Sequence, residues 1–291
     1  SKFVNNLITI SKLVPLTLFI AIGIFFINGA NFTPVFPQDT YVDGSFAQAA
    51  VLLFFAYTGF EVIAIAAEDM KNPKKNLPRA IIMCMLLVSV LYMAILAVSI
   101  GVLGTDLANT KAPVQDAFNV IVGPIGMYIV LIGTLISMGG INFAEAYYAP
   151  RVATSMAEDG MLPSALAKRN RYNAPYVAAI VTAIASVLLA WSGSFTTLAA
   201  ISAVSRFTQY LPTCLAVIIF RRKWADKSRS YTIPGGYLIP VIAIGTSLWM
   251  LAQAQTNQLL WGLGGCIVIL PFYYSYWKKK KAGLIKDHDE M

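Results

Sequence analysis

The chain has 291 residues, of which 57% are hydrophobic and only 12% are charged. Soluble domains carry about 25% charged residues, so this composition indicates a polytopic membrane protein and excludes an ordinary soluble domain. The formal net charge of +8 does not point to nucleic acid, because basic residues gather beside transmembrane segments in any case. We therefore expect the lipid bilayer, and no nucleic acid, as a partner.

Residues for metal or nucleophilic chemistry are scarce. The single histidine, His288, lies in the polar tail, and Cys84, Cys214 and Cys266 fall in separate apolar runs without a CxxC pair. A membrane-embedded enzyme would need a nucleophile with a base, or a set of metal ligands. We therefore expect neither an enzyme nor a bound cofactor or metal.

Eight apolar runs are candidates for transmembrane helices, since about 20 apolar residues cross the hydrocarbon core of a bilayer. They cover about residues 5–27, 46–67, 80–103, 121–150, 174–192, 196–220, 237–254 and 258–276. The expected fold class is an all-α polytopic membrane protein.

Lysine and arginine are concentrated on every second connection between these runs. They cluster in 68–79, 151–173, 221–236 and the C-terminal tail, whereas 28–45 has none and 104–120 has only Lys111. By the positive-inside rule, this alternation fits eight crossings of the cell membrane with both ends of the chain in the cytoplasm.

The run at 46–67 has polar features at its centre. Thr58-Gly59 weakens the helix, since glycine costs about 1 kcal/mol relative to alanine. Glu61 places a carboxylate near the middle of the membrane, which costs at least about 2.5 kcal/mol unless it is paired or hydrated. Transporters use broken helices to hold substrates, because unwound backbone leaves N–H and C=O groups for a ligand. The alternative is a continuous helix with Gly59 as a packing contact and Glu61 protonated or paired.

Four ionisable residues lie inside the predicted spans: Lys12, Glu61, Glu145 and Arg206. Lys12 lies about seven residues, or about 10 Å, into its helix, where it serves a function or snorkels toward the cytoplasm. Arg206 lies deeper in its span and is expected to pair with a carboxylate or to face an aqueous cavity. Two acids and two bases balance, so a purely structural ion-pair network is a second interpretation.

The motifs around the predicted break resemble those of a known family. The segments FAYTGFE (55–61), AAEDMKNP (66–73) and LPRAI (77–81) are similar to the broken sixth helix and following loop of amino acid permeases, members of the amino acid–polyamine–organocation superfamily. The segments SKLVP (11–15) and 151–163 resemble the start of that family's fifth helix and the end of its eighth. The resemblance covers essentially the whole chain.

The resemblance implies an arrangement of helices. Family members have twelve spans, the first ten of which form two inverted repeats of five helices. On that pattern, residues 1–28 are the last helix of the first repeat, 46–220 the second repeat and 237–277 two additional helices, all in one transmembrane domain. The chain then lacks counterparts of the first four helices, including the first broken helix, whose glycine-rich segment holds the substrate's carboxylate.

The resemblance also implies that the break binds substrate. Phe55 matches the aromatic residue that closes over the substrate. The segment whose backbone meets the substrate's amino group corresponds to Ala56, Tyr57, Thr58 and Gly59.

Three ionisable positions receive roles in the same way. Glu61 matches a polar position just beyond the unwound segment. Glu145 falls in a stretch that lines the pocket in relatives, although an acid there is not typical of the family. Lys12 matches a lysine that occupies the place of a sodium ion in sodium-independent members, and we expect it to couple transport to protons.

The expected function is secondary active transport of amino acids by alternating access, with the amino acid and protons as partners. Exchange of one amino acid or amine for another without net proton movement is an alternative, as is a non-transporting membrane subunit or sensor. The substrate's charge stays open. Ionised Glu61 and Glu145 favour a cationic side chain, whereas pairing of either acid with Arg206 favours a neutral one.

Accessibility labelling tests the topology. Single cysteines near Asp39 and Lys111 should react with an impermeant maleimide on intact cells, whereas those near Lys74 and Arg222 should react only after permeabilisation, since basic connections stay in the cytoplasm. A background in which the native cysteines are serine is the control. Labelling near Lys74 on intact cells would contradict the eight crossings.

Overall fold

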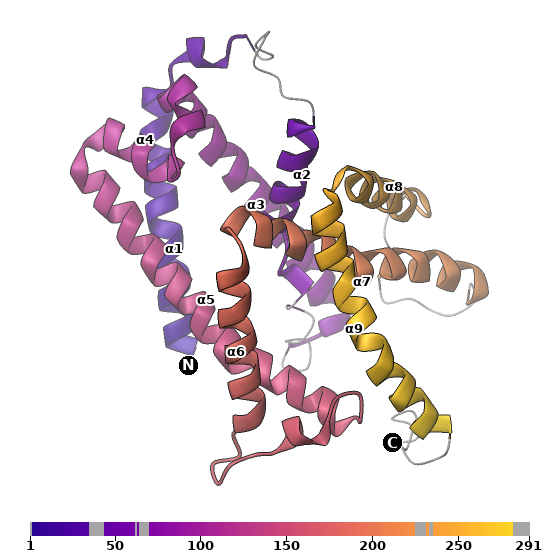
Figure 1. The fold of residues 1–291 in the computed structure, drawn as a ribbon. Coiled ribbons are helices and arrows are strands. Elements are labelled where there is room, and N and C mark those ends of the chain that lie inside the picture. The colour runs from indigo at the N-terminus through magenta and orange to yellow at the C-terminus, as the bar shows by residue number, and fades with distance from the viewer. Residues whose placement is uncertain are drawn as a thin grey trace. The chain divides into compact units, whose positions relative to one another are not determined.

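The computed structural model describes residues 2–34, 44–61, 63, 70–224, 231–232 and 235–281, and these residues contain no β-strand. The α-helices are α1 (Lys2–Gly23), α2 (Ser45–Ala56), α3 (Pro73–Leu103), α4 (Pro113–Val122), α5 (Pro124–Glu158), α6 (Tyr176–Ser192), α7 (Phe195–Lys223), α8 (Leu238–Gln253) and α9 (Thr256–Lys281) (Figure 1). The 3-10 helices are η1 (Ile24–Phe26), η2 (Gly29–Phe32), η4 (Gly104–Asn109) and η5 (Ser164–Ala167). The predicted all-α class is confirmed.

The predicted spans correspond to apolar helices of different lengths. Five helical stretches are long and apolar enough to cross a membrane: Ile8–Phe26, Pro73–Asn109, Pro124–Glu158, Phe195–Lys223 and Thr256–Lys278. The shorter apolar helices α2, α6 and α8 fall in the three other predicted spans. The chain is a multi-pass membrane protein, and the number of eight crossings stays a prediction.

Two span boundaries differ from the sequence prediction, and proline or glycine explains each. The third span is predicted from residue 80, but α3 already begins at Pro73, since the first helical turn does not need the missing N–H. The fourth is predicted as one run over 121–150. Gly123, with φ of +74°, ends α4 there, and Pro124 begins α5, which continues to Glu158.

The structure divides into two compact units. Unit 1 consists of Ser1–Tyr41 and Ile82–Tyr147, and unit 2 of Val42–Ile81 and Tyr148–Met291. The boundaries fall within α3 and α5, so each of these long helices belongs partly to both units. The predicted repeat assignments for 1–28, 46–220 and 237–277 stay predictions.

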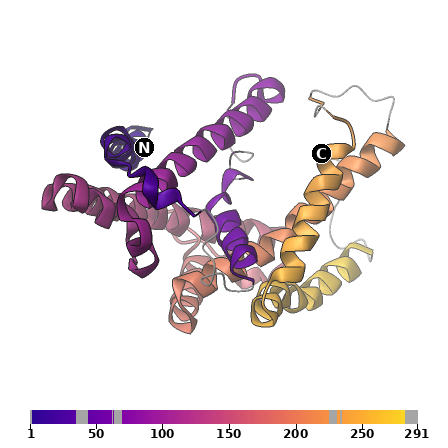
Figure 2. The same ribbon diagram turned by 90° about the horizontal axis from the view of Figure 1, so that it is seen from above.

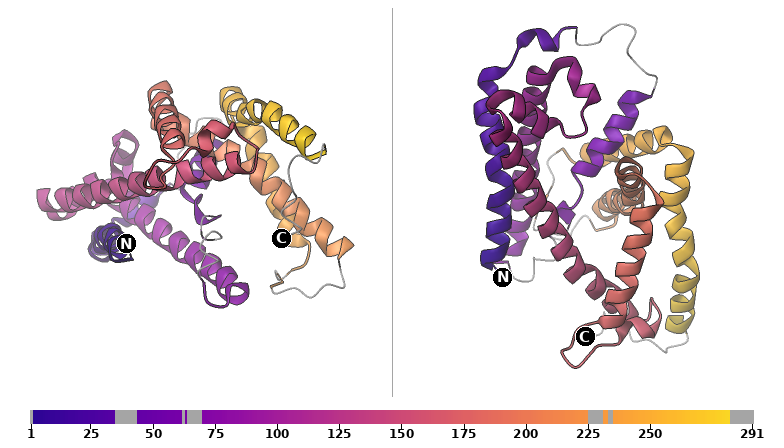
Figure 3. Two further views of the ribbon diagram at one scale, coloured as in Figure 1. Left: turned by 90° about the horizontal axis from the view of Figure 1, so that it is seen from below. Right: turned by 60° about the vertical axis from the view of Figure 1, so that its left-hand side comes forward.

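Unit 1 is organised around buried aromatic and aliphatic side chains. Phe19 of α1 meets Phe118 of α4 edge to face, with ring centroids 5.7 Å apart, and Val98 of α3 joins the same cluster. α5 passes close to α1, because a Cβ built on Gly133 would lie 2.5 Å from Cγ of Pro15 (Figure 3). A glycine at this crossing lets the two backbones approach.

Unit 2 is organised around α7, which packs against α2, α8 and α9 (Figures 1 and 2). Val51 of α2 is buried against Ala200 and Ala203 of α7. At the crossing of α9 and α7, a Cβ on Gly262 would lie 2.7 Å from Cγ1 of Val204. Small residues at both contacts allow the close helix packing that stabilises membrane bundles.

The α7–α9 crossing predicts opposite effects of two matched substitutions. Gly262→Ala should lower thermal stability, since overpacking costs about 1–3 kcal/mol, more than the gain of about 1 kcal/mol in helix propensity. Gly264→Ala should be neutral or slightly stabilising, because among the described residues no atom outside the local helix backbone lies within 4 Å of its Cβ position. Differential scanning fluorimetry in detergent compares them. Equal melting temperatures would show that α9 does not pack on α7 in this way.

Candidate functional site

The regular helix that leads into the predicted break ends at Ala56. The Tyr57 N–H donates to the Phe54 carbonyl at 3.1 Å, and the Thr58 N–H donates to the Phe55 carbonyl at 3.0 Å. Both bonds reach three residues back instead of the four of an α-helix. The ladder of helical hydrogen bonds therefore changes at the position that the sequence predicts.

Gly59 completes the interruption. Its φ is +102°, in the region that glycine adopts far more readily than other residues, and its N–H donates to Oε2 of Glu61 at 2.9 Å. Among the described residues, and apart from its chain neighbours, a Cβ built on Gly59 would meet no atom within 4 Å, so its backbone conformation accounts for the glycine. The continuous helix of the alternative is wrong, whereas the paired Glu61 that the same alternative included is observed.

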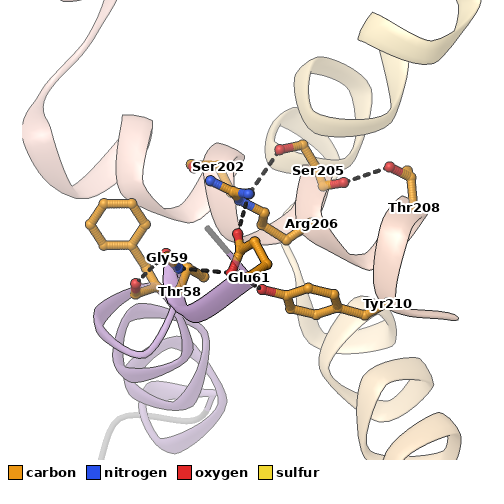
Figure 4. Close-up of polar contacts among 9 residues, drawn as sticks. Thr58, Gly59, Glu61, Ser202, Ser205, Arg206, Thr208 and Tyr210 are labelled. Carbon is orange, nitrogen blue, oxygen red and sulfur yellow. Dashed lines mark hydrogen bonds and ion pairs between the residues drawn. The ribbon is translucent and has the colours of Figure 1, made fainter. Parts of the chain in front are cut away.

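The Glu61 carboxylate joins the break to α7 (Figure 4). Its Oε1 is paired with the Arg206 guanidinium, and its Oε2 accepts from the Tyr210 hydroxyl at 3.1 Å as well as from Gly59 N–H. The Glu61 side chain is 16% exposed and that of Arg206 35%. A partly buried carboxylate is thus held by an ion pair and two further donors, as desolvated charges require.

Aromatic rings surround this polar cluster. Phe54 stacks on the buried Phe207 with centroids 4.7 Å apart, and its ring also meets Tyr210 edge-on at 5.8 Å. Phe60, on the other side of the break, lies 5.9 Å from the Tyr210 ring. The Tyr210 ring is thus packed against Phe54 and Phe60, while its hydroxyl donates to Glu61.

Phe55, the predicted gate, lies at the end of α2. Its ring meets that of Phe195, the first residue of α7, edge-on at 6.1 Å. The Thr58 hydroxyl donates to the Phe55 carbonyl at 2.7 Å. This carbonyl therefore accepts two hydrogen bonds, one from the Thr58 N–H and one from the Thr58 hydroxyl. Closure of Phe55 over a substrate stays a prediction.

An uncharged polar cavity of about 160 Å³ lies one turn before the break. Gln48 of α2, Thr197 near the start of α7, and Gln253 and Gln258 beside the α8–α9 turn contribute to its lining. All of these elements belong to unit 2. Amide and hydroxyl groups here provide hydrogen-bonding groups next to the apolar body of α2.

Lys12 lines a separate groove in unit 1. The groove, about 120 Å³ in volume, lies between α1 and α5 and is also lined by Gly133, Thr134 and Ser137. Lys12 forms no salt bridge with any residue in the described ranges, and its coupling role stays a prediction.

Glu145 lies on α5 with its side chain exposed. Like Lys12 it belongs to unit 1, whereas the break belongs to unit 2, so its role in a substrate pocket stays a prediction. The described ranges contain no group of three or more His, Cys, Asp or Glu side chains that could hold a metal ion.

Two residues gain importance from the structure. In the sequence, Arg206 stands out as a basic residue deep in a predicted span without an assigned role, whereas Tyr210 does not stand out. Both contact Glu61, and they lie four residues apart on α7, the spacing that places two side chains on one helix face. A search for polar residues at this spacing from Arg206 would have found Tyr210.

These features define a class: an all-helical, multi-pass membrane protein with a helix broken inside an apolar segment and a charged pair at the break. The family model described as "Amino acid permease" matches residues 1–276. The chain belongs to the amino acid permease family, as the sequence motifs predict.

Individual relatives agree with this membership. The chain is 30% identical to the branched-chain amino acid permease BcaP of Bacillus subtilis (strain 168), over 96% of the chain and 60% of that protein. It is 29% identical to the methylthioribose transporter of the same organism, over 94% and 59%. It is 28% identical to the serine/threonine exchanger SteT of that organism, over 96% and 65%. The chain thus spans about 60% of the length of these relatives.

The ion pair at the break should stabilise the fold. Glu61→Gln leaves a partly buried guanidinium without its counter-charge, and we expect it to lower the free energy of unfolding by about 1–3 kcal/mol. The double variant Glu61→Gln/Arg206→Gln should lose less than the sum of the two single variants, because it leaves no unpaired charge. Thermal unfolding in detergent measures both effects.

The exposed pair between Arg169 and Glu158 provides the control. Its N···O distance is 2.9 Å, and its side chains are 39% and 47% exposed. Glu158→Gln should therefore change stability by less than about 1 kcal/mol. If Glu61→Gln lowered the free energy of unfolding no more than Glu158→Gln does, the pair at the break would be solvated and would not stabilise the fold.

Proposed function

We propose that the protein carrying this chain is a secondary active transporter of amino acids that works by alternating access. The break at 55–59 binds the substrate's ammonium group, Phe55 closes over the substrate, and Lys12 couples transport to protons. Glu61 and Glu145 complete the residues that this chain contributes. The substrate's carboxylate is assigned to the first broken helix of the family pattern, so the chain supplies part of the site.

The interrupted helix carries this proposal. The C-terminal end of a helix has a partial negative charge, because its peptide dipoles are aligned. α2 ends at Ala56, so this end falls inside an apolar segment. The C-terminal ends of broken helices coordinate cations in transporters, and a substrate ammonium is a cation of the same sign.

The names of relatives support the same function. BcaP is described as a branched-chain amino acid permease and SteT as a serine/threonine exchanger. The word exchanger in the second description fits the alternative of exchange. A further relative is described as a methylthioribose transporter, so membership of the family alone does not fix the substrate.

The groove at Lys12 supports proton coupling. Lys12 lies beside the hydroxyl residues Thr134 and Ser137, which can bind water and pass protons to or from its amine.

Uptake by the full-length protein in proteoliposomes tests the function. Radiolabelled leucine uptake should rise when the outside is made acidic, and Lys12→Ala should abolish this rise. Lys111→Ala, a lysine in the predicted extracellular connection, is the matched control and should keep it. Unchanged gradient dependence in Lys12→Ala would assign Lys12 to snorkelling.

Counterflow separates the alternatives. Uptake that requires amino acid inside the vesicle, with no response to a pH gradient, would establish exchange. Absence of both uptake and exchange, with retained binding, would favour a sensor or a non-transporting subunit.

A further inference from the structure

We propose that Arg206 sets the charge selectivity of the site: paired with Glu61, it leaves the break without net side-chain charge, so the site takes amino acids with uncharged side chains. This inference rests on the proposed function and deepens it by naming the substrate class. It also gives Arg206 a role as a specificity-determining residue.

The first observation behind this proposal is that both oxygens of the Glu61 carboxylate already have partners within the protein. Oε1 is paired with Arg206, and Oε2 accepts from both Gly59 N–H and the Tyr210 hydroxyl. Both oxygens are therefore engaged by groups of the protein itself. A cationic substrate side chain would have to displace Arg206 or share the carboxylate with it, and either arrangement brings two positive charges together at a partly desolvated position.

The absence of other nearby charge is the second step. The helices α2 and α8 contain no acidic or basic residue, and on α9 the basic residues lie only at its C-terminal end. On α7 the remaining basic residues are Arg221, Arg222 and Lys223 in its last turn, fifteen or more positions beyond Arg206. Within the described helices of unit 2 that pack around the break, Glu61 and Arg206 are thus the charged side chains that decide the local charge. Glu145 and Lys12, which the proposed function also uses, lie in unit 1 and carry opposite formal charges, so they add no net charge as a pair.

Because the charges of Glu61 and Arg206 cancel, removing either one should shift the preferred charge of the substrate's side chain in the opposite direction from removing the other. Removing the arginine charge leaves a carboxylate that attracts a cationic side chain, and removing the carboxylate charge leaves a guanidinium that attracts an acidic one. Removing both restores neutrality. A role that is only structural would instead weaken the binding of all amino acids alike.

Competition binding on the purified full-length protein tests this expectation without requiring transport. Radiolabelled leucine is displaced by alanine, serine, lysine, ornithine or glutamate. In the wild type only the neutral amino acids should compete. In Arg206→Gln, lysine and ornithine should improve relative to alanine by about tenfold or more, which corresponds to about 1.4 kcal/mol. In Glu61→Gln, glutamate should improve instead.

Matched variants keep the test decisive. Glu61→Gln/Arg206→Gln should return to neutral selectivity, and it leaves no unpaired charge that could prevent folding. Arg206→Lys keeps the charge and should keep the wild-type order. Arg169→Gln removes an exposed arginine outside the site and should change nothing. Size-exclusion profiles in detergent establish which variants are folded.

The outcomes are distinguishable. Strong competition by lysine in the wild type, or a uniform loss of affinity in folded Arg206→Gln and Glu61→Gln, would overturn the role of Arg206 while leaving amino acid binding intact. Failure of the wild type to bind any amino acid would overturn the proposed function itself, and with it this inference.

Discussion

The Glu61 carboxylate is the point on which the candidate site depends. A break in a helix within an apolar segment exposes backbone groups and, here, a charge, and both are costly in a low-dielectric environment. Arg206 supplies the counter-charge, while Gly59 and Tyr210 supply two further donors. The Glu61 carboxylate is therefore neutralised by Arg206, and it also accepts the N–H of Gly59 in the turn that precedes it.

This arrangement connects the shape of the break to the helix beside it. The ring of Tyr210, whose hydroxyl donates to Glu61, packs against Phe54 before the break and Phe60 after it. The same stacking places Phe54 on Phe207, in the buried part of α7. A movement of α7 relative to α2 would therefore alter the polar contacts and the aromatic contacts together.

The two units place different demands on their residues. In unit 2 the described charged groups at the break, Glu61 and Arg206, are paired with each other. In unit 1 Lys12 lies in a groove with hydroxyl neighbours and is not held by a carboxylate within the described ranges. A division of labour follows, with substrate recognition at the break and proton exchange at the lysine, and it is part of our proposal.

The sequence by itself determined the properties that depend on neighbours along the chain. Apolar runs long enough to span a bilayer identify a multi-pass membrane protein, because hydropathy and length are local quantities. The interruption at Thr58-Gly59 was also predictable, since the helix penalty of glycine and the charge of Glu61 are read from consecutive positions. The motif at 55–61 further indicated the family, which the match over residues 1–276 establishes.

Only the tertiary structure decided which groups meet across the chain. Arg206 is 145 positions from Glu61, and the sequence offered either acid as its partner or an aqueous cavity instead. Tyr210 gave no signal apart from its spacing to Arg206. The start of α3 at Pro73 and the division at Gly123 also required the coordinates, because a proline or a glycine permits several backbone courses and packing selects one. Pairing at a distance depends on how α2 and α7 are packed together, and no local property of either segment contains that information.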